Sequence, residues 1–166
     1  MGAGNVAAPV GWDAVSGAIL AFTPEAFGKR QHQREGKSMK SPGHQQHPDH
    51  KVVERRLAEK AEAQFAGQVL ASTEDVVRVE EDGNPPRLYF SRSAVAMDKL
   101  EPSTTTSRCP FKGTARYFNL KLDGRSLPDA AWSYEDPYDE HQGLKGRIAF
   151  YDDKYQEIHV RPSARA

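Results

Sequence analysis

Short segments that alternate apolar and polar residues, separated by turn-forming residues, make up most of the chain beyond residue 61. The clearest is TARYFNLKL (114–122), which alternates along its whole length and is followed by Asp123-Gly124, a pair typical of a two-residue hairpin. Because successive side chains of a strand point to opposite faces, this period indicates strands and not helices. Short strands with frequent turns predict a small, mainly β, antiparallel domain.

The same pattern predicts further strands, which we expect near 62–66, 68–71, 77–80, 87–90, 130–134, 147–151 and 155–160. Residues 52–59 are rich in helix formers, so we expect a short helix or an irregular segment there. One helical turn is expected within 93–102, ending before Pro102, followed by a polar loop at 103–108. A loop containing a short turn is expected at 136–144.

The 166 residues leave room for one domain of ordinary size and some tail. Residues 1–38 show no sustained period, which predicts a disordered leader, or sequence from an upstream start site. A partner-binding arm centred on Trp12 and Phe22 is the other interpretation. We therefore expect a single β domain at 39–162 and a short tail at 163–166.

The charge balance limits the classes of partner. Lys plus Arg and Asp plus Glu both number 23, so the formal net charge is zero. Proteins that bind phosphate backbones usually carry a basic excess, so no nucleic-acid partner is expected. No segment approaches the ~20 apolar residues of a membrane helix, and no membrane partner is expected.

The chain contains one cysteine, which cannot form an internal disulfide. This fits a reducing compartment, and we predict a cytoplasmic location. The stretch GAILAF (17–22) is short and follows no basic residues, so a signal peptide is not expected. The sequence leaves the oligomeric state and any cofactor open.

Three histidines at positions 44, 47 and 50 suggest a metal site by their spacing. Pro42 and Pro48 interrupt any helix that would place the imidazoles on one face, and no cysteine lies nearby to complete a familiar zinc spacing. We therefore expect a solvated loop here and predict no metal site.

Three longer motifs occur in order: EEDGNPPRLYF (80–90), CPFKGTARYF (109–118) and AAWSYEDPYDEHQGLKGRIAFY (130–151). With these motifs the chain resembles the domain-of-unknown-function-427 family over about 39–162. That family also carries the label of a nucleotidyltransferase domain. The resemblance implies a small antiparallel β domain of tent-like packed sheets with an aromatic-lined groove, and says little about activity.

Metal-dependent nucleotidyl transfer usually needs paired carboxylates that hold divalent ions against the phosphates. Gly124-Arg125-Ser126 is not followed by two aspartates one residue apart. Asp152 and Asp153 are adjacent, so on a strand they would face opposite sides, and Glu135 and Asp136 share this defect unless a loop corrects it. Nucleotidyl transfer is therefore implied only by the family label.

Cys109 has two interpretations. Arg108 and Lys112 lie close in sequence and would favour a reactive thiolate, with His141 or His159 as the base that a nucleophile requires. Most free cysteines instead pack as small apolar residues, and we favour this interpretation. Cys109 and His141 are the candidates for catalysis if the protein is an enzyme.

Aromatic residues gather in the matched motifs, and Trp132 and Tyr134 lie two apart on one strand face. They either form the core of a small β domain or line a groove that stacks a small planar or cationic ligand. The candidate ligand-binding residues are Lys112, Tyr117, Trp132, Tyr134, Asp136, Tyr138 and Arg147. We favour ligand binding; the alternatives are an enzyme using Cys109 or a carboxylate with His141, and an interaction module without a small-molecule site.

Overall fold

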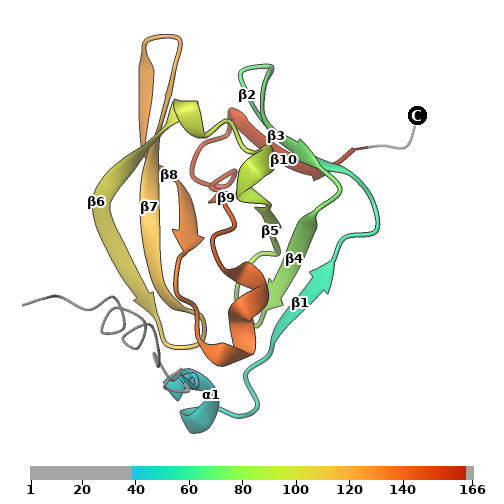
Figure 1. Ribbon diagram of the computed structural model, residues 1–166, viewed down its shortest axis with the longest axis vertical. Helices are drawn as coiled ribbons and strands as arrows, with labels where there is room; N and C mark the ends of the chain where they lie inside the picture. Colours follow the sequence, from blue (N-terminus) through green and yellow to red (C-terminus); the bar gives the residue numbers. More distant parts are fainter. Residues whose placement is uncertain (1–38, 164–166) are drawn as a thin grey trace, which may run out of the picture. The chain divides into compact units, whose positions relative to one another are not determined.

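The computed structural model describes residues 39–163. The predicted leader, with its alternative as an arm around Trp12 and Phe22, lies outside the described residues, as does the tail from 164. The described part is mainly β, with short helices between antiparallel strands (Figure 1). The fold class predicted from the sequence is confirmed.

Ten strands form three antiparallel sheets within the described residues. One sheet has the order β1 (Val52–Arg56), β4 (Val76–Glu81), β5 (Arg87–Phe90). A second has the order β10 (Ile158–Pro162), β2 (Ala61–Phe65), β3 (Gln68–Thr73). The third has the order β6 (Leu100–Cys109), β7 (Gly113–Leu122), β8 (Arg125–Tyr134), β9 (Ala149–Phe150). The short helices are α1 (Pro42–Gln46) and the 3₁₀ helices η2 (Arg92–Ala94), η3 (Met97–Lys99) and η4 (Asp139–Leu144).

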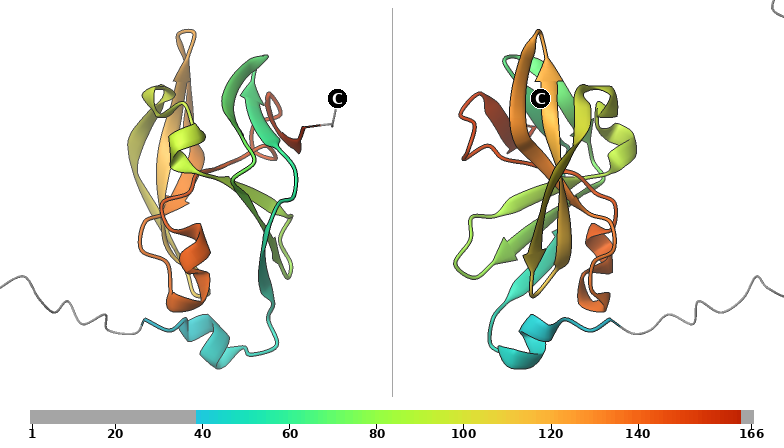
Figure 2. Two further views of the ribbon diagram at one scale, coloured as in Figure 1. Left: turned by 45° about the vertical axis from the view of Figure 1, so that its right-hand side comes forward. Right: turned by 90° about the vertical axis from the view of Figure 1, so that its left-hand side faces the viewer.

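The β6-β7-β8-β9 sheet forms one layer, and the strands of the two smaller sheets lie opposite it (Figure 2, left). Main-chain hydrogen bonds connect the layers, because Phe90 on β5 and Ile148 before β9 bond to each other at 2.8 and 3.0 Å. The edge of the β1-β4-β5 sheet is therefore fixed to the edge of the larger sheet.

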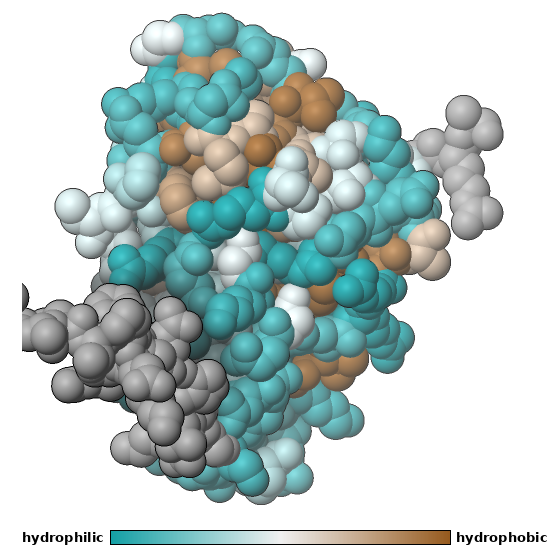
Figure 3. Space-filling view, viewed as in Figure 1, coloured by the Kyte–Doolittle hydropathy of each residue, from teal (hydrophilic) through white to brown (hydrophobic). Residues whose placement is uncertain are grey.

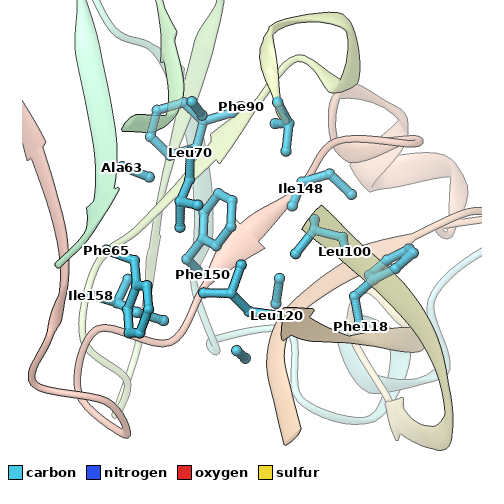
Figure 4. Packing of buried hydrophobic residues seen from close by; sticks show 14 of the residues in the cluster. Ala63, Phe65, Leu70, Phe90, Leu100, Phe118, Leu120, Ile148, Phe150 and Ile158 are labelled. Atoms are coloured by element: carbon cyan, nitrogen blue, oxygen red, sulfur yellow. The ribbon is translucent and has the colours of Figure 1, made fainter. Parts of the chain in front are cut away.

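The main hydrophobic core lies between the layers (Figure 4). Its fully buried members come from all three sheets and include Phe65, Leu70, Phe90, Leu120, Ile148, Phe150 and Ile158. Burying side chains of this size stabilises the fold by roughly 1.5–3 kcal/mol each before entropy is subtracted. The face seen in Figure 3 is largely hydrophilic, with an extended apolar patch in its upper half and smaller ones on its right-hand side.

A second apolar cluster lies beside the first and contains Val77, Val79, Tyr89, Ala115, Trp132, Tyr134, Leu144 and Ala149. Strand β8 contributes to both clusters, with Ala131 in the main core and Trp132 and Tyr134 in the second. A strand covered on both faces reads as a continuous apolar run, which explains the sequence AAWSY at 130–134. The second cluster forms the floor of the candidate site.

Two predictions between residues 52 and 108 were wrong. Residues 52–56 form strand β1 because they pair along β4, with Val53 opposite Glu80, and this pairing outweighs local helix propensity. Residues 103–108 belong to β6 and are not a loop. This strand lies at a sheet edge, so its exposed polar side chains gave no alternating pattern.

The predicted hairpin at Asp123-Gly124 is confirmed, with φ angles of 51° and 72°. Strand β8 begins at Arg125, earlier than predicted, because a bulge interrupts the pattern. At the bulge Asp129 has a φ of 51° and its N–H donates to Asn119 Oδ1 at 2.9 Å. Leu127 before the bulge and Ala131 after it both lie in the main core, opposite Leu120 and Phe118 of β7.

The segment at 39–50 is not the solvated loop that we expected. Ser41 caps α1 by accepting from His44 N at 3.1 Å, and both Ser41 and Gly43 are buried. Gly43 N and Ser41 Oγ donate to Pro110 O at 2.8 and 2.9 Å. The segment is therefore packed against the turn that joins β6 and β7, although His47 is exposed.

Candidate functional site

In the turn from Cys109 to Gly113, the adjacent side chains of Phe111 and Lys112 point in different directions. Phe111 packs against the rings of His44 and His50, at centroid distances of 5.1 and 4.0 Å. Lys112 instead enters a pocket and is 6% exposed. Gly113 has a φ of 117°, and a Cβ there would lie 3.3 Å from Asp136 O, so glycine permits this tight return.

The pocket has a volume of about 250 Å³ and lies between the β1-β4-β5 sheet and the β6-β7-β8-β9 sheet. From β4, β5 and their connection it is lined by Val79, Glu81, Asn84, Pro85, Arg87 and Tyr89. From the larger sheet and its connections it is lined by Cys109, Lys112, Tyr117, Trp132, Tyr134 and Tyr151. This pocket is the candidate functional site.

Aromatic rings form one wall of the pocket. Trp132 and Tyr151 have centroids 4.2 Å apart, and Tyr117 lies parallel to Tyr151 at 6.3 Å. Trp132 Nε1 donates to Tyr89 Oη at 3.2 Å, so its polar atom has a partner. Trp132 and Tyr134 are each 5% exposed, whereas Tyr117 and Tyr151 are half-buried. Trp132 and Tyr134 therefore belong both to the core and to the pocket wall. Tyr117 and Tyr151 provide the ring surface that a ligand can reach.

Lys112 and Glu81 form a buried ion pair in the pocket, with side chains 8% and 11% exposed. His50 Nε2 lies 3.6 Å from the other carboxylate oxygen, Glu81 Oε1. Removing a charge from water costs several kcal/mol for each ion. Each of these two buried charges therefore needs the other to offset its desolvation cost. Burial raises the pKa of both Tyr89 and Tyr134, which keeps these hydroxyls protonated at neutral pH.

Arg87 was not predicted as a site residue. Its guanidinium lies 5.6 Å from the Trp132 ring centroid and 5.5 Å from that of Tyr151. Asp152 and Asp153 accept its hydrogen bonds at 2.8 and 2.5 Å. The bond from Arg87 to Asp153 lowers the pKa of Asp153. The adjacent aspartates that are poor as a metal pair therefore hold an arginine against the aromatic wall.

Of the residues predicted to bind ligand, Lys112, Tyr117, Trp132 and Tyr134 line the pocket. Asp136 and Tyr138 lie elsewhere, in a separate hollow with Arg108 and Arg116. Arg147 is also outside the pocket, bound to Asp75 and to Gly143 O. Asp136, Tyr138 and Arg147 therefore do not contribute to the pocket, although Leu144 of the same loop packs in the second apolar cluster.

The two catalytic candidates lie in different environments. Cys109 is half-buried, packs against the second apolar cluster and lines the pocket. His141 lies outside the pocket, with Nδ1 2.6 Å from Glu54 Oε1 and Nε2 2.9 Å from His44 Nε2. His159, the other candidate base, is exposed on β10 and lines a separate hollow.

Sequence reasoning could have found part of what it missed. Arg87 and Tyr89 lie two apart in the RLYF strand and therefore on one face, so an aromatic site at Tyr89 implies a neighbouring arginine. No local pattern connects Glu81 with Lys112, which are 31 residues apart. Between residues 39 and 163, no group of three or more His, Cys, Asp or Glu side chains is placed to hold a metal ion.

The fold and pocket define a small antiparallel β protein with an aromatic-walled pocket between two sheets. The family described as Domain of unknown function (DUF427), whose model is labelled NTP_transf_9, matches residues 54–161. The chain belongs to this family, and the resemblance seen in the sequence is confirmed. A comparison with curated proteins finds no match. No helix in the described residues is long and apolar enough to cross a membrane.

Proposed function

We propose that this protein binds a small planar or cationic ligand in the pocket, by stacking against the aromatic wall. The observation that carries the proposal is the parallel arrangement of Tyr117 and Tyr151, half-buried rings that continue the buried face of Trp132. Aromatic surface left partly open beside charged groups is typical of pockets that orient a planar ligand.

The carboxylates near the pocket favour binding over metal-dependent nucleotidyl transfer. Glu81 is engaged by Lys112, and Asp152 and Asp153 are engaged by Arg87. Carboxylates paired with cations of the protein compete poorly as ligands for divalent ions. The transfer activity implied by the family label is therefore not our proposal, and a cytoplasmic location stays a prediction.

The test is a thermal-shift screen over planar and cationic compounds, followed by calorimetry on every compound that stabilises the protein. Tyr117→Ala should weaken binding by about 1–3 kcal/mol, the worth of one stacking contact. Tyr155→Ala is the matched control, because Tyr155 is also half-buried but lies outside the pocket. Equal losses in both variants, or no hit in the screen, would contradict the proposal.

Fluorescence gives a second readout, because Trp132 is part of the wall. A ligand in the pocket should quench Trp132 emission in a protein in which Trp12 has been replaced by phenylalanine. Tyr134→Ala should reduce affinity if this ring contacts ligand. If Tyr134→Ala lowers stability but leaves affinity unchanged, the Tyr134 ring is core alone.

A further inference from the structure

The pocket already contains a cation over its aromatic wall. The Arg87 guanidinium lies within 6 Å of the Trp132 and Tyr151 ring centroids, the range of a cation–π contact. Asp152 and Asp153 hold it in this position. Arg87 already occupies the cation–π position over these two rings, so a ligand cation cannot take the same position and the remaining ring surface favours an uncharged ring.

The Lys112–Glu81 pair has hydrogen-bonding capacity that the protein leaves unused. An ammonium carries three donors, and a carboxylate oxygen accepts more than one bond. Among residues 39–163, Lys112 Nζ donates only to Glu81 Oε2, and Glu81 Oε1 accepts no hydrogen bond. His50 Nε2 lies 3.6 Å from Oε1, too far for a hydrogen bond, and is itself buried without a hydrogen-bond partner.

Tyr134 adds a further unused donor. Its side chain lines the same pocket and is 5% exposed, and no hydrogen bond joins its hydroxyl to another residue of the described chain. Burial raises its pKa, so the hydroxyl keeps its proton at neutral pH. Glu81 and Tyr134 both line the pocket, and Glu81 Oε1 and Tyr134 Oη are not among the fully buried atoms that lack a partner. A ligand that pairs with these two atoms gains hydrogen bonds that no other residue of the described chain competes for.

Resting on the proposed function, we infer that the ligand is a neutral planar heterocycle with a lactam edge, a carbonyl oxygen next to a ring N–H. The carbonyl oxygen accepts from Lys112 and Tyr134, and the ring N–H donates to Glu81 Oε1. The pocket volume of about 250 Å³ holds one or two fused rings. Such an edge occurs both in free bases and in nucleotides.

The test is calorimetry on the full chain with three probes. Hypoxanthine carries the lactam edge, 1-methylhypoxanthine differs only by a methyl group on the lactam nitrogen, and benzamidinium is a planar cation. Hypoxanthine should bind about 10- to 100-fold more tightly than 1-methylhypoxanthine, the loss expected for one hydrogen bond to a buried charge. It should also bind more tightly than benzamidinium.

The outcomes separate the inference from the proposed function. Equal binding of hypoxanthine and 1-methylhypoxanthine would retain a stacking pocket but overturn the lactam edge. Tightest binding of benzamidinium would overturn the lactam edge and retain a cation-binding pocket. No binding of any probe, together with no hit in the screen, would overturn both.

A matched pair of variants tests whether Glu81 is the residue that contacts the lactam edge of the ligand. Glu81→Gln should reduce the preference for hypoxanthine over its methyl derivative, because an amide oxygen is a weaker acceptor than a carboxylate oxygen. Glu80→Gln should retain the preference, because Glu80 is the neighbouring residue on β4 and lies outside the pocket. An unchanged preference in Glu81→Gln would overturn the assignment. If Glu81→Gln fails to fold, the comparison of probes on the unchanged chain still decides.

A fourth probe, inosine 5′-monophosphate, distinguishes the two sources of the edge. Binding equal to that of hypoxanthine identifies the base alone as the recognised group. Tighter binding identifies a nucleotide whose phosphate adds contacts. Both results support the lactam edge, whereas loss of binding on attachment of the ribose restricts the ligand to free heterocycles.

Discussion

Replacing Lys112 with methionine removes the cation from a buried ion pair and leaves the Glu81 carboxylate without a partner. Both side chains are about nine-tenths buried, so water screens the lost interaction only weakly. Breaking such a pair from one side costs about 3–5 kcal/mol. For a domain of this size that loss corresponds to a fall in melting temperature on the order of 10–20 °C.

The assay is urea unfolding, monitored by tryptophan fluorescence, for the unchanged protein, Lys112→Met, and the double variant Lys112→Met/Glu81→Leu. All three proteins are measured in the same buffer at one pH, so that only the substitutions differ. The double variant should recover most of the loss, because two apolar side chains remove both charges from the interior. A loss below about 1 kcal/mol for Lys112→Met, or no recovery in the double variant, would refute the reasoning.

Three further predictions concern other parts of the domain. Gly43→Ala should destabilise the protein by about 1–3 kcal/mol in urea unfolding, because its Cβ would lie 2.7 Å from the Phe111 ring. Cys109→Ala should cost roughly 1 kcal/mol, and a charged thiol reagent should label the native protein slowly; fast labelling would contradict a packing role. The hydrogen bond from Arg147 lowers the pKa of Asp75 below its ordinary 3.8. The ionised carboxylate therefore stabilises the folded protein above that pH, and this stabilisation is lost as the pH falls through the lowered pKa. Asp75→Asn should make the free energy of unfolding less dependent on pH in the acid range.

A strand could be predicted from its sequence where one of its faces is buried and the other is exposed to solvent. The hairpin of β7 and β8 is the example, since alternation and Asp123-Gly124 agree. Prediction failed for 52–56, where pairing with β4 outweighs helix propensity, and for 103–108, where an edge strand carries polar residues on both faces. Local sequence contains neither the pairing partner nor the position in the sheet.

The pocket was predictable where its residues share a strand or a turn. Trp132 and Tyr134 lie on one face of β8, and Lys112 lies in a turn with a glycine that permits close approach. Glu81 and Arg87 come from another sheet, and only the folded chain brings them to these residues. Asp136 and Tyr138 were predicted to bind ligand with Trp132, because they follow it closely in the sequence, but they lie outside the pocket. Proximity in sequence does not determine which side of the sheet a residue occupies.

The contact of Phe111 with His44 and His50 has a consequence for the boundary of the folding unit. The family match begins at residue 54, yet both rings that cover Phe111 precede it. A chain shortened to the matched region would leave this aromatic side chain uncovered beside Lys112. We therefore predict that the smallest form of this protein that folds on its own starts before the shared family region, at the segment that begins with Met39.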